Sequence, residues 1–372
     1  MSKKKKEELQ FYSLDNILKR NAHYNVIIGE RSNGKTTAVL KYCLRHFVET
    51  GKETAYIRRY EDDLKGSKGE SVFSGLLNLG GYNYIEEITE GHYTTIVYKG
   101  RAWYLAVYDE IEEKLQLQAQ PFARAFALTQ QERYKGLSYP DIDTVLFDEF
   151  LTRGYYLHDE FITYMNLLST IIRQRDGIKI FMLGNTVNKY SPYFAEMGLK
   201  HVKDMKKGSI DLYTYGTTQL KVAVEFADFP SKEKPSDVYF AFDNPRLNMI
   251  TGQGQVWEIA IYPHAPMKWK PKDIMLTYFI IFEGDMLQCE IIAASGTVFT
   301  FIHRKTTELQ DPDHDLIFTP DYDPRHNWRR KLTKPFDQIG RKIAWFYAAD
   351  KVYYQDNEVG EVVRNYLQFS NT

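Results

Sequence analysis

Gly29-Glu30-Arg31-Ser32-Asn33-Gly34-Lys35-Thr36-Thr37 is the stretch that decides the fold of this 372-residue chain. The apolar residues 24–28 before it predict a short buried strand. The periodic segment from Lys35 to about Thr50, closed by Gly51, predicts a helix. A strand, a glycine-containing loop and a helix in this order form a phosphate cradle, because the backbone can wrap closely and the helix N-terminus supplies N–H donors. The sequence therefore predicts a P-loop.

Each residue type in this loop has a chemical task in nucleotide binding. Gly29 and Gly34 permit the wrap, Lys35 reaches the β- and γ-phosphates, and Thr36 can ligate Mg²⁺. A chance glycine-rich turn is the alternative, but it does not explain the flanking strand and helix. The predicted cofactors are ATP and Mg²⁺, and the predicted nucleotide contacts are Gly29, Arg31, Asn33, Gly34, Lys35, Thr36 and Thr37.

Residues 144–150, Thr-Val-Leu-Phe-Asp-Glu-Phe, give a second signal: an apolar strand that ends in two carboxylates. P-loop proteins use the first carboxylate to hold the hydration shell of Mg²⁺ and can use the second to polarise the attacking water. Asp148 is thus a predicted nucleotide and metal contact, and Glu149 the predicted catalytic base. We expect their strand to neighbour the P-loop strand. The pair favours hydrolysis, and a solvated acidic turn is the alternative.

A polar amide and two arginines complete the predicted catalytic set. Asn185 follows the apolar strand 178–183 and is placed to sense the γ-phosphate or to hold the attacking water. Arg173 and Arg175 leave the preceding helix, and a guanidinium offered to a neighbouring subunit's nucleotide is a common activating device. The alternatives are an asparagine that caps a turn and arginines that complement a helix dipole.

Basic residues elsewhere in the first half are weaker candidates. Lys135 lies near the nucleotide edge of the returning strand and is a candidate catalytic cation. Four residues at the end of the predicted strand 54–58 and in the loop after it are candidate DNA contacts, and a solvated charged face is the alternative. These four are Arg58, Arg59, Lys65 and Lys68.

The chain is expected to fold as an α/β protein of two domains. Residues 1–226 form the predicted P-loop domain, with a parallel sheet and a lid-like insertion at about 69–138 that contains a hairpin. Residues 227–272, rich in Gly and Pro, are the predicted linker. Residues 273–372 form a small predicted α+β domain with strands at 275–282, 286–292 and 298–302.

The second domain carries basic groups interleaved with aromatic rings between residues 323 and 342. Phosphate backbones and splayed bases favour such surfaces, so the cluster predicts RNA binding, with a plain charged surface as the alternative. The acids at 311–315, with His314, are interpreted as a solvated turn and not as a metal site. The predicted RNA contacts are Arg325, Trp328, Arg329, Arg330, Lys331 and Lys334.

Composition sets the outer limits of these predictions. Lys+Arg 48 against Asp+Glu 49 gives a net charge of −1, so a polyanion must be held by local basic patches. The 28 Tyr and 22 Phe exclude wholesale disorder. Only Cys43 and Cys289 are present, which excludes a disulfide framework and indicates a reducing compartment. No signal-like or membrane-spanning segment is evident, so we expect a soluble intracellular protein.

With these motifs assembled, the chain resembles the DNA-encapsidation ATPases of small podophages of the Picovirinae type. Those proteins are relatives of large-terminase motors in the additional-strand, catalytic-glutamate (ASCE) division. One departure is Glu61, because the family's DNA-facing loop tends to have a lysine after Arg-Arg-Tyr; this shifts the expected DNA grip to Lys65 or Lys68. The resemblance rests on residues 26–29 with the P-loop, 56–60, 97–101, 139–140, 145–150, 167–175, 184–185 and 192–194.

The resemblance implies a motor that hydrolyses ATP to drive double-stranded viral DNA into a procapsid. It implies a homo-oligomeric ring, a pentamer, at the portal vertex, in the host cytoplasm and transiently on the procapsid. It further implies Arg173 as the trans-acting arginine and Lys135 as a second cation between subunits. The C-terminal domain would be RNase H-like, without working nuclease carboxylates, and docked on a packaging RNA.

Three other functions stay open at this stage. A P-loop kinase would transfer the γ-phosphate and would not need the Asp148-Glu149 pair. A nucleotide switch would turn over slowly and ignore DNA. A full terminase would have a nuclease built from Glu283, Asp285 and Glu290, although the first two flank a tight turn, whereas two-metal nucleases need converging carboxylates.

Overall fold

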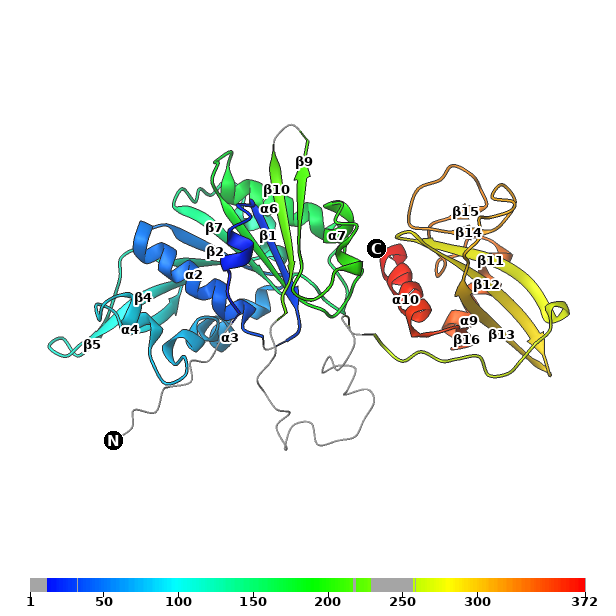
Figure 1. Ribbon diagram of the computed structural model, residues 1–372, viewed down its shortest axis with the longest axis horizontal. Helices are drawn as coiled ribbons and strands as arrows, with labels where there is room; N and C mark the ends of the chain where they lie inside the picture. Colours follow the sequence, from blue (N-terminus) through cyan, green and yellow to red (C-terminus); the bar gives the residue numbers. More distant parts are fainter. Residues whose placement is uncertain (1–11, 32, 217–218, 229–256, 258, 372) are drawn as a thin grey trace. The chain divides into compact units, whose positions relative to one another are not determined.

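The computed structural model describes residues 12–31, 33–216, 219–228, 257 and 259–371 (Figure 1). The chain divides into two compact units, residues 1–241 and 242–372. The division falls inside the predicted linker, residues 227–272, most of which lies outside the described residues, as does the lysine-rich start of the chain. Within the described residues, no helix is both long and apolar enough to cross a bilayer.

The first unit is built on one large sheet with the strand order β3-β4-β6-β2-β7-β8-β1-β10-β9, with β5 paired to β4. The six strands β6, β2, β7, β8, β1 and β10 run parallel to one another, which confirms the predicted α/β class. Parallel strands buried on both faces are continuously apolar, as in β1. The strands are β1 (Tyr24–Gly29), β2 (Glu53–Arg58), β3 (Thr95–Lys99), β4 (Ala102–Asp109), β5 (Lys114–Leu117), β6 (Ala123–Ala127), β7 (Ile142–Asp148), β8 (Lys179–Asn185), β9 (Ile210–Tyr215) and β10 (Leu220–Phe226).

Helices cover both faces of this sheet. Leu146 of β7 packs in the core cluster of α2, whereas the next residue, Phe147, stacks near Tyr164 of α6. Successive strand residues point to opposite faces, so α2 and α6 lie on opposite sides. The helices and 3₁₀ turns are α1 (Asp15–Leu18), α2 (Lys35–Thr50), η1 (Glu61–Leu64), α3 (Gly66–Ser71), η2 (Ser74–Leu77), α4 (Tyr84–Ile88), η3 (Leu128–Gln130), α5 (Gln131–Tyr134), α6 (Glu160–Ile172), α7 (Pro192–Glu196) and η4 (Val202–Asp204).

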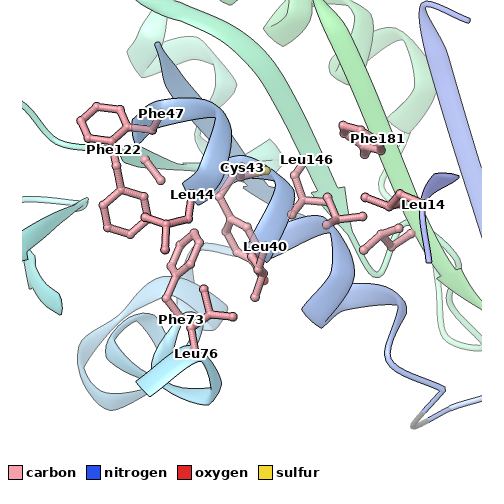
Figure 2. Close-up of a cluster of buried hydrophobic side chains, with 14 of the residues drawn as sticks. Leu14, Leu40, Cys43, Leu44, Phe47, Phe73, Leu76, Phe122, Leu146 and Phe181 are labelled. Atoms are coloured by element: carbon pink, nitrogen blue, oxygen red, sulfur yellow. The ribbon is translucent and has the colours of Figure 1, made fainter. Parts of the chain in front are cut away.

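The helix α2 fixes the P-loop because its apolar face is buried along its whole length. Leu40, Cys43, Leu44 and Phe47 recur at helical spacing and pack against the sheet and against Phe73 of the insertion (Figure 2). Burial of one such leucine contributes roughly 1.5–3 kcal/mol. The helix ends at a left-handed Gly51, as its sequence predicts.

The segment 69–138 differs from the expected lid-like insertion, because it extends the sheet. Its hairpin, β3 and β4, is present, but β4 pairs with β6 and β6 pairs with β2 in parallel. The short sequence Ala-Arg-Ala-Phe-Ala of β6 gave no recognisable strand signal because alanine has low β-propensity. The strand forms because the alternate residues Ala123, Ala125 and Ala127 are buried.

Two further differences concern the strands around β1. The sheet continues beyond the predicted set, because β10 pairs with β1 and β9 pairs with β10. The two carboxylates were expected to end a strand beside the P-loop strand β1. Instead, they end β7, which is separated from β1 by β8. The insertion of β8 brings Asn185 level with Gly29 in the register.

The second unit is a six-stranded sheet with the order β15-β14-β11-β12-β13-β16. Tyr278 and Phe282 lie on one face of β11 and contact Tyr347 of α9 and Phe369 of α10, so both helices cover that face. Its three long strands confirm the predicted ones, and the likeness to an RNase H-like domain stays a prediction. The elements are η5 (Pro271–Asp273), β11 (Ile274–Phe282), β12 (Asp285–Ala294), β13 (Thr297–Arg304), β14 (Ile317–Phe318), β15 (Trp328–Arg329), α9 (Gln338–Ala348), β16 (Val352–Tyr354) and α10 (Asn357–Asn371).

Candidate nucleotide site

The P-loop forms a cradle in which the Lys35 ammonium is central. Gly34 has a left-handed φ of 84° and lets the helix α2 begin at Lys35. The Nζ atom of Lys35 donates to the carbonyls of Gly29 at 3.2 Å and Glu30 at 2.6 Å. Burial lowers the pKa of Lys35 to about 8, although the charges of Asp148 and Glu30 act in the opposite direction. The cation is thus held in the loop by carbonyl dipoles.

The loop also holds a buried donor that fits an anion. The Oδ1 atom of Asn33 accepts from the backbone and ammonium of Lys35, whereas its Nδ2 atom has no partner among the described residues. A side chain at Gly29 would clash, because an added Cβ would lie 2.9 Å from that Nδ2 atom. Buried donors without partners are rare in native proteins. An orphan donor beside an ammonium therefore suits the phosphates of a nucleotide. Arg31 is exposed and Thr37 half-buried.

Thr36 and Asp148 meet at the mouth of this cradle. The Thr36 hydroxyl donates to the Oδ1 atom of Asp148 at 3.5 Å, and the Tyr56 hydroxyl donates to the Oδ2 atom at 3.0 Å. Burial raises the pKa of Asp148, and the Arg58 charge opposes the rise. A hydroxyl and a carboxylate in this arrangement suit Mg²⁺, which binds oxygen and commonly takes few protein ligands beside phosphates and water.

Glu149 lies next to Asp148 in a strained conformation. Its φ is +59°, a region that costs a residue with a side chain about 1 kcal/mol or more. Its carboxylate is 55% exposed and accepts from the Nη2 atom of Arg58 at 2.5 Å. Arg58 is thereby part of the carboxylate site. The strained turn projects the carboxylate out of the strand, and Arg58 determines where it points.

Asn185 completes the same edge. It ends β8, and its Oδ1 atom accepts from the Lys35 ammonium at 3.3 Å. The carboxyl ends of β1, β2, β7 and β8 thus bring together Lys35, Asp148, Glu149 and Asn185, as the sequence predicted. Tyr56 and Arg58 also belong to this group, and the sequence did not place them there, because the register between β2 and β7 has no sequence signal.

Arg59 is not available to DNA, and this prediction is corrected. Its side chain is 7% exposed and its Nε atom donates at 2.8 Å to Glu160, which is fully buried. Its remaining donors reach the carbonyls of Glu149 at 3.3 Å and Phe150 at 2.6 Å. A phosphate cannot reach this guanidinium. Arg59 instead braces the turn after the two carboxylates.

The loop after β2 neutralises its own lysines. Lys65 contacts Asp62 at 2.8 Å and Glu61 at 3.9 Å, and Lys68 contacts Asp63 at 3.5 Å. Both lysines are exposed, at 60% and 63%. Each nevertheless has an acidic neighbour, so the loop presents little net positive charge to DNA.

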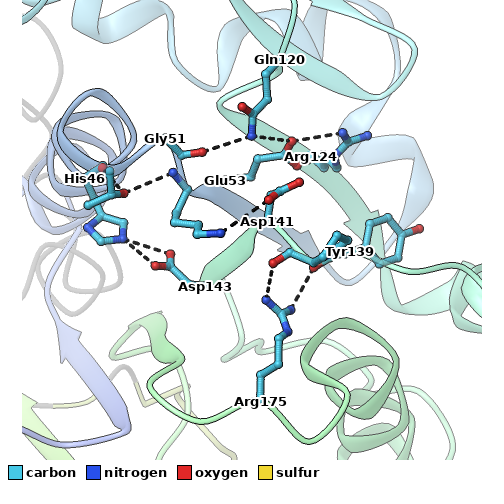
Figure 3. A network of polar contacts seen from close by, with 12 residues as sticks. His46, Gly51, Glu53, Gln120, Arg124, Tyr139, Asp141, Asp143 and Arg175 are labelled. Atoms are coloured by element: carbon cyan, nitrogen blue, oxygen red, sulfur yellow. Dashed lines mark hydrogen bonds and ion pairs between the residues drawn. The ribbon is translucent and has the colours of Figure 1, made fainter.

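The opposite edge of the sheet, where the strands begin, carries the two arginines after α6, of which Figure 3 shows Arg175. Arg175 donates to the carbonyls of Tyr139 at 2.9 Å, Pro140 at 2.8 Å, Ile171 at 2.7 Å and Ile172 at 3.0 Å. Such a guanidinium is a structural tie, so Arg175 is not free to act as a trans finger.

Arg173 differs from Arg175 in its setting. It closes α6 with a left-handed φ of 45°, and its exposed guanidinium donates to one carbonyl, that of Leu137, at 2.6 Å. Lys135 is 55% exposed and pairs with Glu132 at 2.6 Å. Arg173 and Lys135 are both at the surface, as candidates for contact between subunits require.

The basic cluster of the second unit is partly neutralised. Arg325 pairs with Asp323 at 2.8 Å and lies over the ring of Trp328. Arg329 pairs with Asp337 at 2.6 Å. Three basic residues of the cluster are exposed, namely Arg330, Lys331 and Lys334. These three fit the predicted polyanion surface better than Arg325 or Arg329.

The candidate nuclease acids do not converge. Asp285 pairs with Arg304, and Glu290 is hydrogen-bonded by Gln288 at 2.7 Å. Glu283 sits in the exposed turn between β11 and β12. Within the described residues, no three His, Cys, Asp or Glu side chains are grouped as a metal site, the 311–315 turn included.

A model of the podovirus DNA encapsidation protein (Gp16) family matches residues 6–238. The DNA packaging protein of Bacillus phage phi29 is 24% identical over 357 residues, covering 90% of this chain and 96% of the relative. That of Bacillus phage PZA is 27% identical over 354 residues, with the same coverage. A solved structure, the bacteriophage Phi-29 viral genome packaging motor assembly, is similar with a TM-score of 0.56 at 20% identity, covering 97% of this chain and 99% of that one.

Proposed function

The chain belongs to the podovirus DNA encapsidation protein (Gp16) family, and from this premise we propose that it is an ATP-hydrolysing motor that drives double-stranded DNA into a procapsid. The observation that carries the proposal is one cluster of polar side chains at the carboxyl ends of four strands. There, the Lys35 ammonium, the Asp148 carboxylate and the Asn185 amide lie within one network, with Glu149 beside it.

The residues that would hold ATP and Mg²⁺ follow from their donors and acceptors. Lys35, the Asn33 amide and the N-terminus of α2 suit the phosphates, and Thr36 with Asp148 suits Mg²⁺. Bound Mg²⁺ supplies charge neutralisation at the phosphates. Asn185 would orient the attacking water through the network that it shares with Lys35.

Glu149 is the proposed general base. It must leave Arg58 to accept a proton from water, because the carboxylate oxygen that Arg58 engages is not free to meet the water. Its exposure and its place at a turn allow that movement. The adjacent carboxylate Asp148 is buried, so the two acids have separate roles, one at the metal and one at the water.

Arg173 is the proposed trans-acting arginine. The seven residues of β8 separate the end of α6 from Asn185, and at about 3.3 Å per residue this is about 20 Å. An arginine side chain does not span that distance, so Arg173 cannot reach the nucleotide of its own subunit. A ring of identical subunits would bring it to a neighbour's pocket, with Lys135 as a second cation at the same interface.

The finer partners follow from the same premise. We propose a pentameric ring at the portal vertex of a procapsid in the host cytoplasm, and a packaging RNA as the partner of the exposed basic residues in the second unit. Arg330, Lys331 and Lys334 would contact the RNA backbone. A full-length variant with all three changed to Ala should bind structured RNA with a weaker salt dependence.

A kinase is the second candidate function, and the Glu149 turn argues against it, because a kinase base acts on a substrate hydroxyl and not on water.

The test of the proposal is the ATPase rate per subunit against protein concentration, with and without double-stranded DNA. We expect release of phosphate, a rate that rises with concentration, and stimulation by DNA. Transfer of the γ-phosphate to a small acceptor, or a rate unaffected by both variables, would contradict the motor.

A further inference from the structure

A basic ridge, residues 199–207, lies between α7 and β9. Leu199, Val202 and Met205 are buried at every third position, with exposures of 2%, 0% and 6%. The positions between these anchors carry basic residues, and the turn η4 gives the segment a fixed shape. A preorganised charged surface loses little entropy when it binds. The basic residues of the ridge are Lys200, His201, Lys203, Lys206 and Lys207.

The ridge is attached to the sheet beside the P-loop. Gly208 donates to the carbonyl of Phe226 at 2.7 Å, and Phe226 donates back to Ser209 at 3.0 Å. Phe226 is at the end of β10, in register with Ile28 of β1. The ridge therefore sits at the same edge of the sheet as the nucleotide pocket.

A direct ion pair joins the ridge to the P-loop. The ammonium of Lys207 contacts the carboxylate of Glu30. The carbonyl of that same Glu30 accepts from the Lys35 ammonium at 2.6 Å. One residue of the loop thus contacts the cation of the nucleotide site through its main chain and the ridge through its side chain.

A second link runs to the segment after Asn185. The ammonium of Lys203 lies 4.5 Å from the centre of the Tyr190 ring, which is 1% exposed. Tyr190 follows β8 by five residues, so the ridge packs on the segment that leaves the strand at Asn185. Movement of the P-loop or of this strand end would change the position of the ridge.

Charge distinguishes the ridge from the loop after β2. The ridge has four lysines against one acid, Asp204, whereas residues 61–71 have two lysines against four acids. An approaching polyanion is therefore attracted by the ridge and not by that loop.

We propose that the ridge 199–207 holds the phosphate backbone of double-stranded DNA, and that the pair of Lys207 with Glu30 couples this hold to the nucleotide site. The proposal rests on the proposed motor function, because it names the surface by which the ATPase unit grips its DNA. Lysine contacts to phosphates release counterions, so the grip is independent of base sequence and sensitive to salt.

The test compares two double variants of the full-length chain. Lys200→Ala with Lys206→Ala removes two exposed charges from the ridge without touching Glu30, and Lys65→Ala with Lys68→Ala removes two from the loop after β2. Binding of a 30-base-pair duplex is measured by anisotropy over a salt series, after thermal unfolding has confirmed folding. For the ridge variant we expect the slope of log affinity against log salt to fall by about 1.8, at about 0.9 per lost contact, and for the loop variant a smaller change.

The outcomes separate this proposal from the function on which it rests. If the wild-type chain binds DNA and the ridge variant has the same slope of log affinity against log salt, the ridge is not the DNA contact, although the motor function stands. A loss of affinity confined to the loop variant would lead to the same conclusion. A wild-type chain that binds no duplex at any salt would overturn both. A ridge variant that loses affinity for an RNA duplex but not for the DNA duplex would assign the ridge to RNA and contradict the proposal.

The coupling is tested with Glu30→Gln, which keeps the size of the side chain and removes the charge. We expect the DNA affinity to stay within about twofold, because the ridge lysines remain. The ratio of DNA-stimulated to DNA-free ATPase rate should fall several-fold. An unchanged ratio would show that the ion pair does not transmit DNA binding to the nucleotide site.

Discussion

The two edges of the main sheet use polar side chains in opposite ways. At the edge where the strands end, Asn33 keeps an unpaired buried donor and Glu149 adopts a strained backbone. At the edge where the strands begin, polar side chains are paired with each other: His46 with Asp143 at 2.9 Å, and Arg124 with Glu53 at 2.5 Å (Figure 3). Backbone strain occurs at both edges, since Arg173 at the second edge also has a positive φ of 45°, so the difference lies in the donors: a buried amide without a partner beside an ammonium suits an anion. The first edge is therefore suited to a ligand and the second to stability.

The largest effect expected at the ligand edge is that of Lys35→Ala. The change removes a charged donor from a buried site, so ATP affinity should fall by more than about 100-fold, equivalent to about 3 kcal/mol. Lys52→Ala is the matched control, because Lys52 lies at the other edge and pairs with Asp141 at 3.5 Å. Fluorescent-nucleotide titration checks both variants. Equal losses in the two would erase the distinction between the edges.

The second prediction concerns Glu149→Gln. An amide of the same shape is a poor base, so kcat should fall by about 100- to 10,000-fold while ATP affinity is kept. Single-turnover release of phosphate and nucleotide titration measure the two quantities separately. A kcat equal to that of the wild type would remove Glu149 from the role of base.

The third prediction tests whether Arg173, at the edge where the strands begin, acts only on the nucleotide of a neighbouring subunit. Arg173→Ala subunits and Glu149→Gln subunits are each expected to be inactive. A mixture should recover activity, because an intact pocket can then meet an intact arginine of its neighbour. Recovery as a function of mixing ratio is the readout. No recovery at any ratio would argue for action within one subunit.

The sequence predicts the edge where the strands end better than the edge where they begin. The P-loop and the carboxylate turn were recognised because backbone geometry and phosphate chemistry require those residue types in consecutive positions. The role of Arg59 was mistaken because its partner, Glu160, is 101 residues away, and pairing across a sheet leaves no local pattern. The strand β6 was missed because its alanines have low β-propensity, whereas β10 was missed although Leu-Lys-Val-Ala-Val-Glu-Phe carries β-branched residues. The Arg175 tie could not be inferred either, since backbone carbonyls carry no sequence signal.

The fourth prediction concerns Arg175, whose four backbone contacts hold the end of α6 against residues 139–140. Arg175→Ala should lower the free energy of unfolding by about 1–3 kcal/mol, because four backbone carbonyls lose a charged donor. Denaturant titration gives this value. ATP affinity should not change, since the pocket lies at the other edge. A large loss of nucleotide affinity with unchanged stability would contradict the division between the edges.

The smallest expected effect is a pH dependence that belongs to the ligand edge alone. Burial lowers the pKa of Lys35 to about 8, so the ammonium is charged at pH 7 and mostly neutral at pH 9. A triphosphate favours the charged form and should raise this pKa, so binding takes up protons near pH 8. ATP affinity should therefore be nearly constant below about pH 7 and fall by about fivefold between pH 8 and pH 9. Calorimetry at pH 8 in two buffers of different ionisation enthalpy should show an uptake of about half a proton per nucleotide. The Lys52→Ala control should retain the same uptake, because its ammonium lies at the opposite edge. Release of protons on binding would mean that the nucleotide meets a different titrating group first.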